Sequence, residues 1–173
     1  MRLGIDFGGT KIEGALLDST GEILNRQRVP NPGDYRSAVR AVADLVAKIE
    51  SDTARRISVI GLAIPGSLSP KTGLVRNANS VWLNGMPFEQ DLETELKRPV
   101  RVENDANCFA LSEAVDGAAA HGRVVFGVIL GTGCGGGVVV ERKVIRGANG
   151  IGGGWGHTPL PWPRADEVPV QDW

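Results

Sequence analysis

A short pattern that occurs twice constrains the fold of this chain more than any other feature of its sequence. Residues 3–17, LGIDFGGTKIEGALL, and residues 128–142, VILGTGCGGGVVVER, each contain an apolar strand, a turn with glycine and threonine, and a second strand. Alternating and β-branched residues favour strands on both sides of each turn. The repeat predicts a duplicated α/β unit whose second copy is cut short.

The segments around the repeat predict alternating strands and helices. The apolar run 56–66 suits a strand that is covered on both faces of a sheet. Residues 67–84, rich in Gly, Pro, Asn and Ser, suit a long surface loop, and such loops are often functional. The predicted order is three antiparallel strands over 3–30, a helix over 35–53 that begins at an Asp34 cap, the strand 56–66, the loop, a helix over 88–97, a strand over 100–105, a helix over 106–120 and further strands within 123–147.

Charge and composition exclude several classes of partner. Lys and Arg number 19 and Asp and Glu number 20, so no strong net charge favours nucleic acid or a membrane surface. No apolar run approaches the roughly 18 residues of a membrane span, and no signal peptide follows Met1. The two cysteines, Cys108 and Cys134, stand apart, as in a reducing compartment. We expect a cytoplasmic protein that acts on a compact polar substrate and binds neither nucleic acid nor membrane.

The two glycine turns are candidate phosphate sites. The spacing of Gly131, Gly133 and Gly136 matches half of a dinucleotide-binding fingerprint, but the following residues predict a strand where that motif requires a helix. A glycine-rich hairpin turn can instead direct backbone N–H groups at an anion. In the first turn, Asp6 is suited to hold hydrated Mg²⁺ and Lys11 to neutralise phosphate charge. A plain hairpin without a ligand remains the alternative for either turn alone.

A third candidate is the acidic residue in ENDANCFALSEA. Asp105 lies where a predicted strand passes into a helix, so its carboxylate would project from the end of the sheet. The positive end of the helix dipole would favour the ionised form, which a base that accepts a hydroxyl proton requires. An N-cap aspartate without chemistry is the alternative.

Taken together, GIDFGGTK, IPGS, ENDANCFALSEA, GTGCGGG and GWGH resemble the ROK family of bacterial sugar kinases, over essentially the whole chain. The sequences of residues 65–88 and of GHTPLPW most resemble the fructokinase or mannofructokinase branch, with N-acetylglucosamine kinases second. The resemblance implies the actin-like, ribonuclease H-like ATPase fold. Residues 1–118 would form the N-terminal lobe, and residues 119–173 an incomplete start of the second lobe.

The resemblance also implies a reaction and its residues. An ATP- and Mg²⁺-dependent enzyme would phosphorylate the 6-hydroxyl of a hexose, fructose or mannose first, with N-acetylglucosamine or glucose as the alternative. Asp105 would be the catalytic base. The nucleotide side would comprise Asp6, Gly8, Gly9, Thr10, Lys11, Gly131, Thr132 and Gly133, with Asp6 near the metal, and the sugar side Gly66, Asn79, Asn104, Asp105 and His157.

Two departures from the family pattern limit what the resemblance implies. Gly154 stands where the family carries a glutamate that binds sugar, and losing such a hydrogen bond costs about 1.5–3 kcal/mol. His157 matches a position that faces the sugar or a structural Zn²⁺, but the Cys-rich zinc loop of relatives is missing, so we expect no complete zinc site. The chain looks truncated, and open strands in 124–146 predict a homodimer or other self-association.

Two other functions compete with the kinase. The first is a truncated, catalytically impaired relative that at most binds sugar or phosphate. The second, a repressor of the same family, would need a helix-turn-helix ahead of the first turn, for which the chain offers no room before Leu3.

Overall fold

Alternating burial along the first strand determines the architecture of the larger sheet. In β1 (Arg2–Phe7), the side chains of Leu3, Ile5 and Phe7 are buried, whereas those between them are exposed. One face of the sheet is therefore core and the other is polar. The computed structural model describes residues 1–131, 133–156, 158–159, 161–164 and 166–167.

The larger sheet is mixed and has five strands. As predicted, β1, β2 and β3 are consecutive antiparallel strands, and β4 and β7 extend the sheet in parallel on the other side of β1. The order of the strands in space is β3 (Ile23–Pro30), β2 (Lys11–Leu17), β1, β4 (Ile60–Ile64) and β7 (Val100–Asn104).

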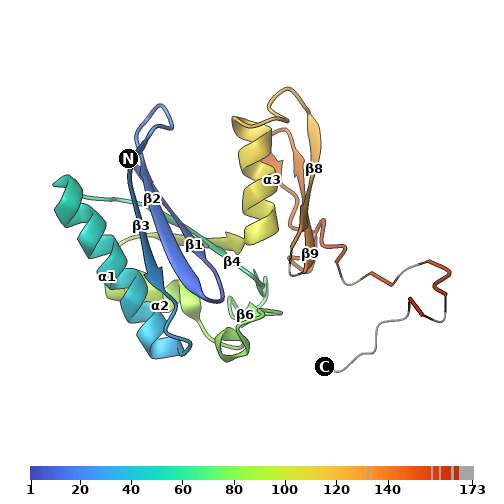
Figure 1. Ribbon diagram of the computed structural model, residues 1–173, viewed down its shortest axis with the longest axis horizontal. Helices are drawn as coiled ribbons and strands as arrows, with labels where there is room; N and C mark the ends of the chain where they lie inside the picture. Colours follow the sequence, from blue (N-terminus) through green and yellow to red (C-terminus); the bar gives the residue numbers. More distant parts are fainter. Residues whose placement is uncertain (132, 157, 160, 165, 168–173) are drawn as a thin grey trace.

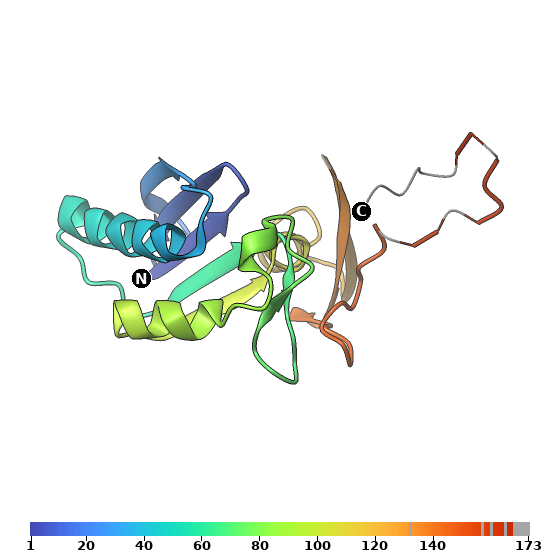
Figure 2. The ribbon, with the colours of Figure 1, turned by 90° about the horizontal axis from the view of Figure 1, so that it is seen from below.

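Helices α1 (Tyr35–Thr53) and α2 (Phe88–Leu96) cover the apolar face of this sheet (Figures 1 and 2). Asp34 caps α1 as predicted, because its Oδ1 accepts a hydrogen bond of 3.0 Å from the N–H of Ser37. The expectation that the strand around β4 is covered on both faces was wrong. Ile60 and Leu62 point into the core, but Gly61 between them is exposed, since small residues on the second face leave little to bury.

The predicted surface loop over 67–84 is more ordered than expected. It contains a hairpin of β5 (Ser67–Leu68) and β6 (Val75–Arg76) and a 3-10 turn, η1 (Val81–Leu83). Val75, Ala78 and Leu83 are buried in the main core. Gly, Pro and Asn mark the turns of this segment correctly, but two-residue strands are too short for an alternating pattern to reveal.

The second sheet repeats the antiparallel order of the first three strands, as the sequence repeat predicts. Its spatial order is β10 (Lys143–Val144), β9 (Cys134–Val140) and β8 (Val124–Leu130). Helix α3 (Asp105–Val115) packs on one face of it (Figure 1). The predicted boundary after residue 118 falls between α3 and β8 and stays a prediction. Among the described residues, no helix combines the length and apolar character needed to cross a membrane.

Glycines allow α3 to lie directly on the backbone of β8 and β9. A Cβ at Gly137 would come within 2.8 Å of the Ala106 carbonyl oxygen and 2.9 Å of Asn107 Cα. A Cβ at Gly127 would come within 2.9 Å of Ala110 Cα. Because the clashing atoms belong to backbone, no side-chain rotation can relieve the contact. The glycine-rich composition of β9 therefore fixes how closely α3 approaches the second sheet.

We expect Gly137→Ala to lower the free energy of unfolding by about 1–3 kcal/mol, because α3 must move away from β9. Gly4→Ala in β1 is the matched control, since a Cβ there meets nothing within 4 Å, and its effect should stay within about 0.5 kcal/mol. Urea unfolding followed by circular dichroism measures both. Equal effects of the two substitutions would contradict the close contact.

Candidate functional site

The first glycine turn joins β1 to β2 and is closed by its own backbone. The N–H of Gly8 donates to the carbonyl oxygen of Lys11 over 2.9 Å. Within the described residues, the N–H groups of Gly9 and Thr10 have no recorded acceptor, and a Cβ at Gly9 would meet no atom within 4 Å. Two adjacent backbone donors in open space fit an anion such as a phosphate.

Asn31 holds this turn in place, and sequence reasoning missed it. Its side-chain Nδ2 donates to the carbonyl oxygen of Gly8 over 2.8 Å, and its backbone N–H donates to that of Thr10 over 3.0 Å. These bonds engage carbonyl groups of the turn and leave the N–H groups of Gly9 and Thr10 free. The Asn-Pro pair indicated a turn after β3, but no local pattern indicates a bond to a residue 23 positions away.

Asp6 and Lys11 lie at the two ends of the same turn. Asp6 lies on the face of β1 opposite to α1 and α2, and its side chain is exposed. Lys11 is the exposed first residue of β2. One carboxylate with open surroundings fits Mg²⁺, which keeps several waters and shares its remaining ligands with phosphate groups. The assignment of Asp6 to the metal stays a prediction.

Helix α3 follows β7 directly and is capped by Asn104. An N-cap at Asp105, the alternative expected from the sequence, is therefore wrong. Asn104 Oδ1 accepts from the N–H of Asn107 over 3.1 Å, which is the standard capping contact. Asp105 is therefore the first helical residue. Its Oδ1 accepts from the N–H of Ala106 over 2.8 Å and from Asn104 Nδ2 over 2.9 Å, so these two bonds orient the carboxylate.

The pKa of Asp105 is raised, against the direction expected from the helix dipole. Burial of the carboxylate is the largest cause, and the negative charge of Asp6 adds to it. The hydrogen bonds from Ala106 and Asn104 act in the opposite direction but do not outweigh burial. A higher pKa makes the ionised carboxylate a stronger base.

Three predicted sugar-side residues meet beside this carboxylate. Asn104 Nδ2 also donates to the carbonyl oxygen of Gly66 over 2.9 Å. The N–H of Asn79 donates to the carbonyl oxygen of Pro65 over 3.2 Å. A Cβ at Gly66 would lie 3.0 Å from Ala78, so a side chain there would be tightly crowded. The structure thus brings Gly66 and Asn104 together with Asp105 and ties Asn79 to the residue before Gly66, while their role in sugar binding stays a prediction.

Glu103 links this group to the segment after β10. Its Oε1 accepts from the N–H of Asn104 and from Asn107 Nδ2, each over 3.0 Å. Its Oε2 forms an ion pair of 2.6 Å with Arg146, in the segment after β10. One carboxylate therefore fixes the first turn of α3 relative to that segment.

The second glycine turn lies next to the start of α3. The N–H of Gly131 donates to the carbonyl oxygen of Gly133 over 2.9 Å, and a Cβ at either residue would meet nothing within 4 Å. A Cβ at Gly135 would lie 3.3 Å from Ala106 Cβ, so the start of β9 lies against the residue after Asp105. Both hairpins end on the lower side of Figure 1, with the start of α3 between them. Thr132 lies outside the described residues.

The glycine-rich segment after β10 packs on β9. Trp155 Nε1 donates to the carbonyl oxygen of Gly135 over 2.9 Å. Gly154 is exposed, and its N–H donates to the carbonyl oxygen of Ile151 over 3.0 Å. His157 lies outside the described residues, so its predicted sugar and zinc contacts stay predictions. In the described part of the chain, no three His, Cys, Asp or Glu side chains gather as metal ligands, and the residues present do not fit a structural zinc.

Comparison with known proteins gives the following similarities. Residues 2–169 match the sequence profile of the ROK family. An N-acetyl-D-glucosamine kinase from Vibrio cholerae is 44% identical over 162 residues, which are 93% of this chain and 53% of that protein. A ROK hexokinase structure from Thermus thermophilus matches with a TM-score of 0.81 and 36% identity, over 92% of this chain and 53% of that one.

A ROK family glucokinase structure from Streptomyces griseus, in complex with glucose and AMPPNP, matches with a TM-score of 0.83 and 31% identity. That match covers 92% of this chain and 51% of the glucokinase. The chain thus spans about half the length of the relatives it matches.

The raised pKa of Asp105 predicts a pH-dependent stability difference. A raised pKa means that the fold favours the protonated carboxyl, so stability is lost as the pH rises through the folded-state pKa. Asp105→Asn is neutral throughout, so its free energy of unfolding should exceed that of the wild type at pH 7. The difference should shrink toward about pH 3, below the unfolded-state pKa.

Urea unfolding at the two pH values measures this difference. The exposed Asp44→Asn in α1 controls for the general loss of one negative charge. An Asp105→Asn variant that is less stable than the wild type at pH 7 would show that the carboxylate is not destabilised by its surroundings.

Proposed function

Because the chain belongs to the ROK family, we propose that it supplies the catalytic base and both phosphate-binding turns of an ATP-dependent hexose kinase. The observation that carries the proposal is the position of Asp105. This partly buried carboxylate lies at the start of α3, whose second residue contacts the strand after the second glycine turn, and it feels the charge of Asp6, which precedes the turn with two free N–H groups. The arrangement suits transfer of a phosphoryl group to a hydroxyl next to a base.

In this proposal, each group of residues has a separate role in the reaction. Asp105 accepts the proton of the sugar 6-hydroxyl through the carboxylate that Ala106 and Asn104 orient. Gly66, Asn79 and Asn104 hold the sugar. The N–H groups of Gly9 and Thr10, with the Lys11 ammonium and the second turn, hold the phosphates of ATP. Mg²⁺ near Asp6 would neutralise phosphate charge.

N-acetylglucosamine is the substrate that we propose first. The sequence resemblance favoured fructose or mannose, but curated relatives at 42–44% identity, among them the Vibrio cholerae protein described above, are named N-acetyl-D-glucosamine kinases. They support the alternative over the first expectation. Glucose is the next candidate, because the Streptomyces griseus relative was solved with glucose.

A catalytically impaired sugar-binding protein is the second candidate. Gly154 favours it, because the family resemblance places a sugar-binding glutamate there and the structure offers only an exposed backbone turn. Such a protein would keep the contacts around Asn104 and bind sugar weakly without transferring phosphate.

A coupled assay of ADP release with N-acetylglucosamine, glucose, fructose and mannose tests the kinase. We expect the highest kcat/KM with N-acetylglucosamine and a loss of about 10²–10⁴-fold in Asp105→Asn, because the proton acceptor is removed. Asp44→Asn should keep wild-type activity. Absence of turnover on all four sugars would favour the impaired protein, and unchanged activity of Asp105→Asn would exclude it as the base.

We also propose that the protein self-associates through β8. This strand is at an edge of its sheet, and four of its apolar side chains, Val124, Phe126, Val128 and Leu130, are 40–72% exposed. An edge strand with an open apolar face is a template for pairing with another copy.

Size-exclusion chromatography with light scattering should find a dimer or larger species that Phe126→Lys converts to monomer. Val81→Lys replaces a still more exposed apolar residue, in η1, and should leave the assembly unchanged. A monomeric wild type would rule out this assembly.

A further inference from the structure

Arg76 carries a charged group whose hydrogen-bonding capacity is unused. Its guanidinium Nε and Nη2 are shielded from solvent and have no hydrogen-bond acceptor among the described residues. No ion pair with Arg76 is found in that part of the chain either. Shielding two donors of a cation without an acceptor is costly, so native structures rarely do so without a reason.

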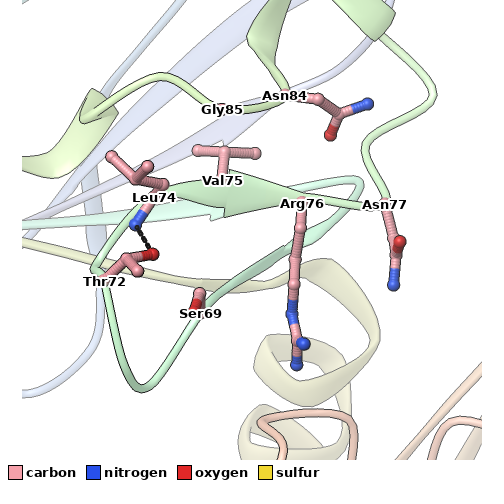
Figure 3. Close-up of a pocket in the computed structure, with 8 residues that line it drawn as sticks. All are labelled: Ser69, Thr72, Leu74, Val75, Arg76, Asn77, Asn84 and Gly85. Carbon is pink, nitrogen blue, oxygen red and sulfur yellow. Dashed lines mark hydrogen bonds between the residues drawn. The ribbon is translucent and has the colours of Figure 1, made fainter.

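The hairpin places a second unused polar group on the same face. Ser67 in β5 is directly opposite Arg76 in β6, so the two side chains project to the same side. Ser67 is only 7% exposed, and its Oγ also has no partner. The neighbouring pair, Leu68 and Val75, projects to the other side, toward the main core. Figure 3 shows the Arg76 side chain pointing away from Val75 and toward α3.

The unused nitrogens have the geometry of an anion receptor. Nε and Nη2 form one side of the planar guanidinium, and their parallel N–H groups match two oxygens of one phosphate or carboxylate. A hydroxyl such as that of Ser67 can donate a further bond. A hollow of about 500 Å³ adjoins Arg76 beside the hairpin, although Ser67 is not among the residues that line it.

This receptor adjoins the sugar side of the candidate site. A Cβ at Gly66 would lie 3.0 Å from the carbonyl oxygen of Arg76, and Gly66 in turn accepts the bond from Asn104. A ligand that reaches Asn104 and Asp105 therefore passes close to the β5–β6 hairpin. Because solvent does not reach Nε and Nη2 in this structure, their occupation requires the hairpin to move relative to its surroundings.

We propose that Arg76 and Ser67 form an anion subsite that takes a two-oxygen anionic group, phosphate or carboxylate, carried by a hexose. The inference rests on the proposed function in that its ligand is a hexose. It adds that, without nucleotide, the chain binds a phosphorylated or acidic hexose more tightly than a neutral one; the neutral sugars remain the proposed phosphoryl acceptors. Arg76 binds the two oxygens from the side, and Ser67 donates to one of them.

Isothermal titration calorimetry of the whole chain without nucleotide tests the subsite. Glucose 6-phosphate is the probe that carries a phosphate, and glucuronate is the probe that carries a carboxylate. Glucose carries no anionic group and is the neutral reference. We expect one anionic probe to bind at least about 10-fold more tightly than glucose, the scale of hydrogen bonds to a charged group. The preferred probe identifies the anion.

Variants of Arg76 separate recognition from charge. In Arg76→Met, the ratio of the affinities for the anionic probe and for glucose should fall to about one. Arg76→Lys should lose most of the preference, since an ammonium lacks the planar pair of donors. Arg101→Met, an exposed arginine of β7, should keep it. Circular dichroism checks folding, and Ser67→Ala replaces Arg76→Met if that variant does not fold.

Three results would overturn the subsite: equal affinity of the wild type for all probes, no binding of any probe, or an unchanged preference in Arg76→Met. An Arg76→Met variant that is more stable but keeps the preference would assign the site to a buried water. The calorimetry measures binding and not turnover, so its outcome does not depend on whether the kinase proposal holds. A chain that prefers glucose 6-phosphate through Arg76 but phosphorylates no sugar keeps the subsite and loses the catalytic proposal.

Discussion

The contact between the backbone of α3 and the glycines of β8 and β9 is the constraint on which the rest of the site depends. Gly127 and Gly137 have no side chain where Ala110 and Ala106 approach them, so helix and sheet meet almost backbone to backbone. This contact places the first residue of α3, Asp105, near the start of β9 and therefore near the second glycine turn. A larger residue at Gly137 would separate the proposed base from the proposed phosphate site.

The same arrangement accounts for the electrostatics of Asp105. Close packing removes water from the carboxylate and raises its pKa, and the nearby charge of Asp6 raises it further. Ionisation of Asp105 in the fold therefore costs stability, and the same raised pKa makes its ionised form a stronger base. Stability and the proposed chemistry oppose each other at this residue, as is common at functional sites.

Much of the fold could be predicted from the sequence because its signals are local. The repeat of strand, glycine turn and strand predicted both antiparallel units, and Asp34 predicted the start of α1. The features that were missed depend on contacts between distant segments. The bonds of Asn31 to the first turn, the burial that reverses the pKa shift of Asp105, and the two-residue strands β5 and β6 leave no periodic pattern. Asn104 and Asp105 both suit a helix start, so only the backbone distinguishes the cap.

The ion pair of Glu103 with Arg146 has a consequence for how variants of this protein would be interpreted. Glu103 holds the N–H of Asn104 and the side chain of Asn107 while its other oxygen binds Arg146, 43 positions further along the chain. Arg146 is largely exposed and far in sequence from Gly66, Asn79 and Asn104. In a genetic screen it would look like a tolerant surface position, yet its loss would alter the alignment of the proposed base. Natural variation at residue 146 should therefore be weighed as variation in the proposed catalytic site.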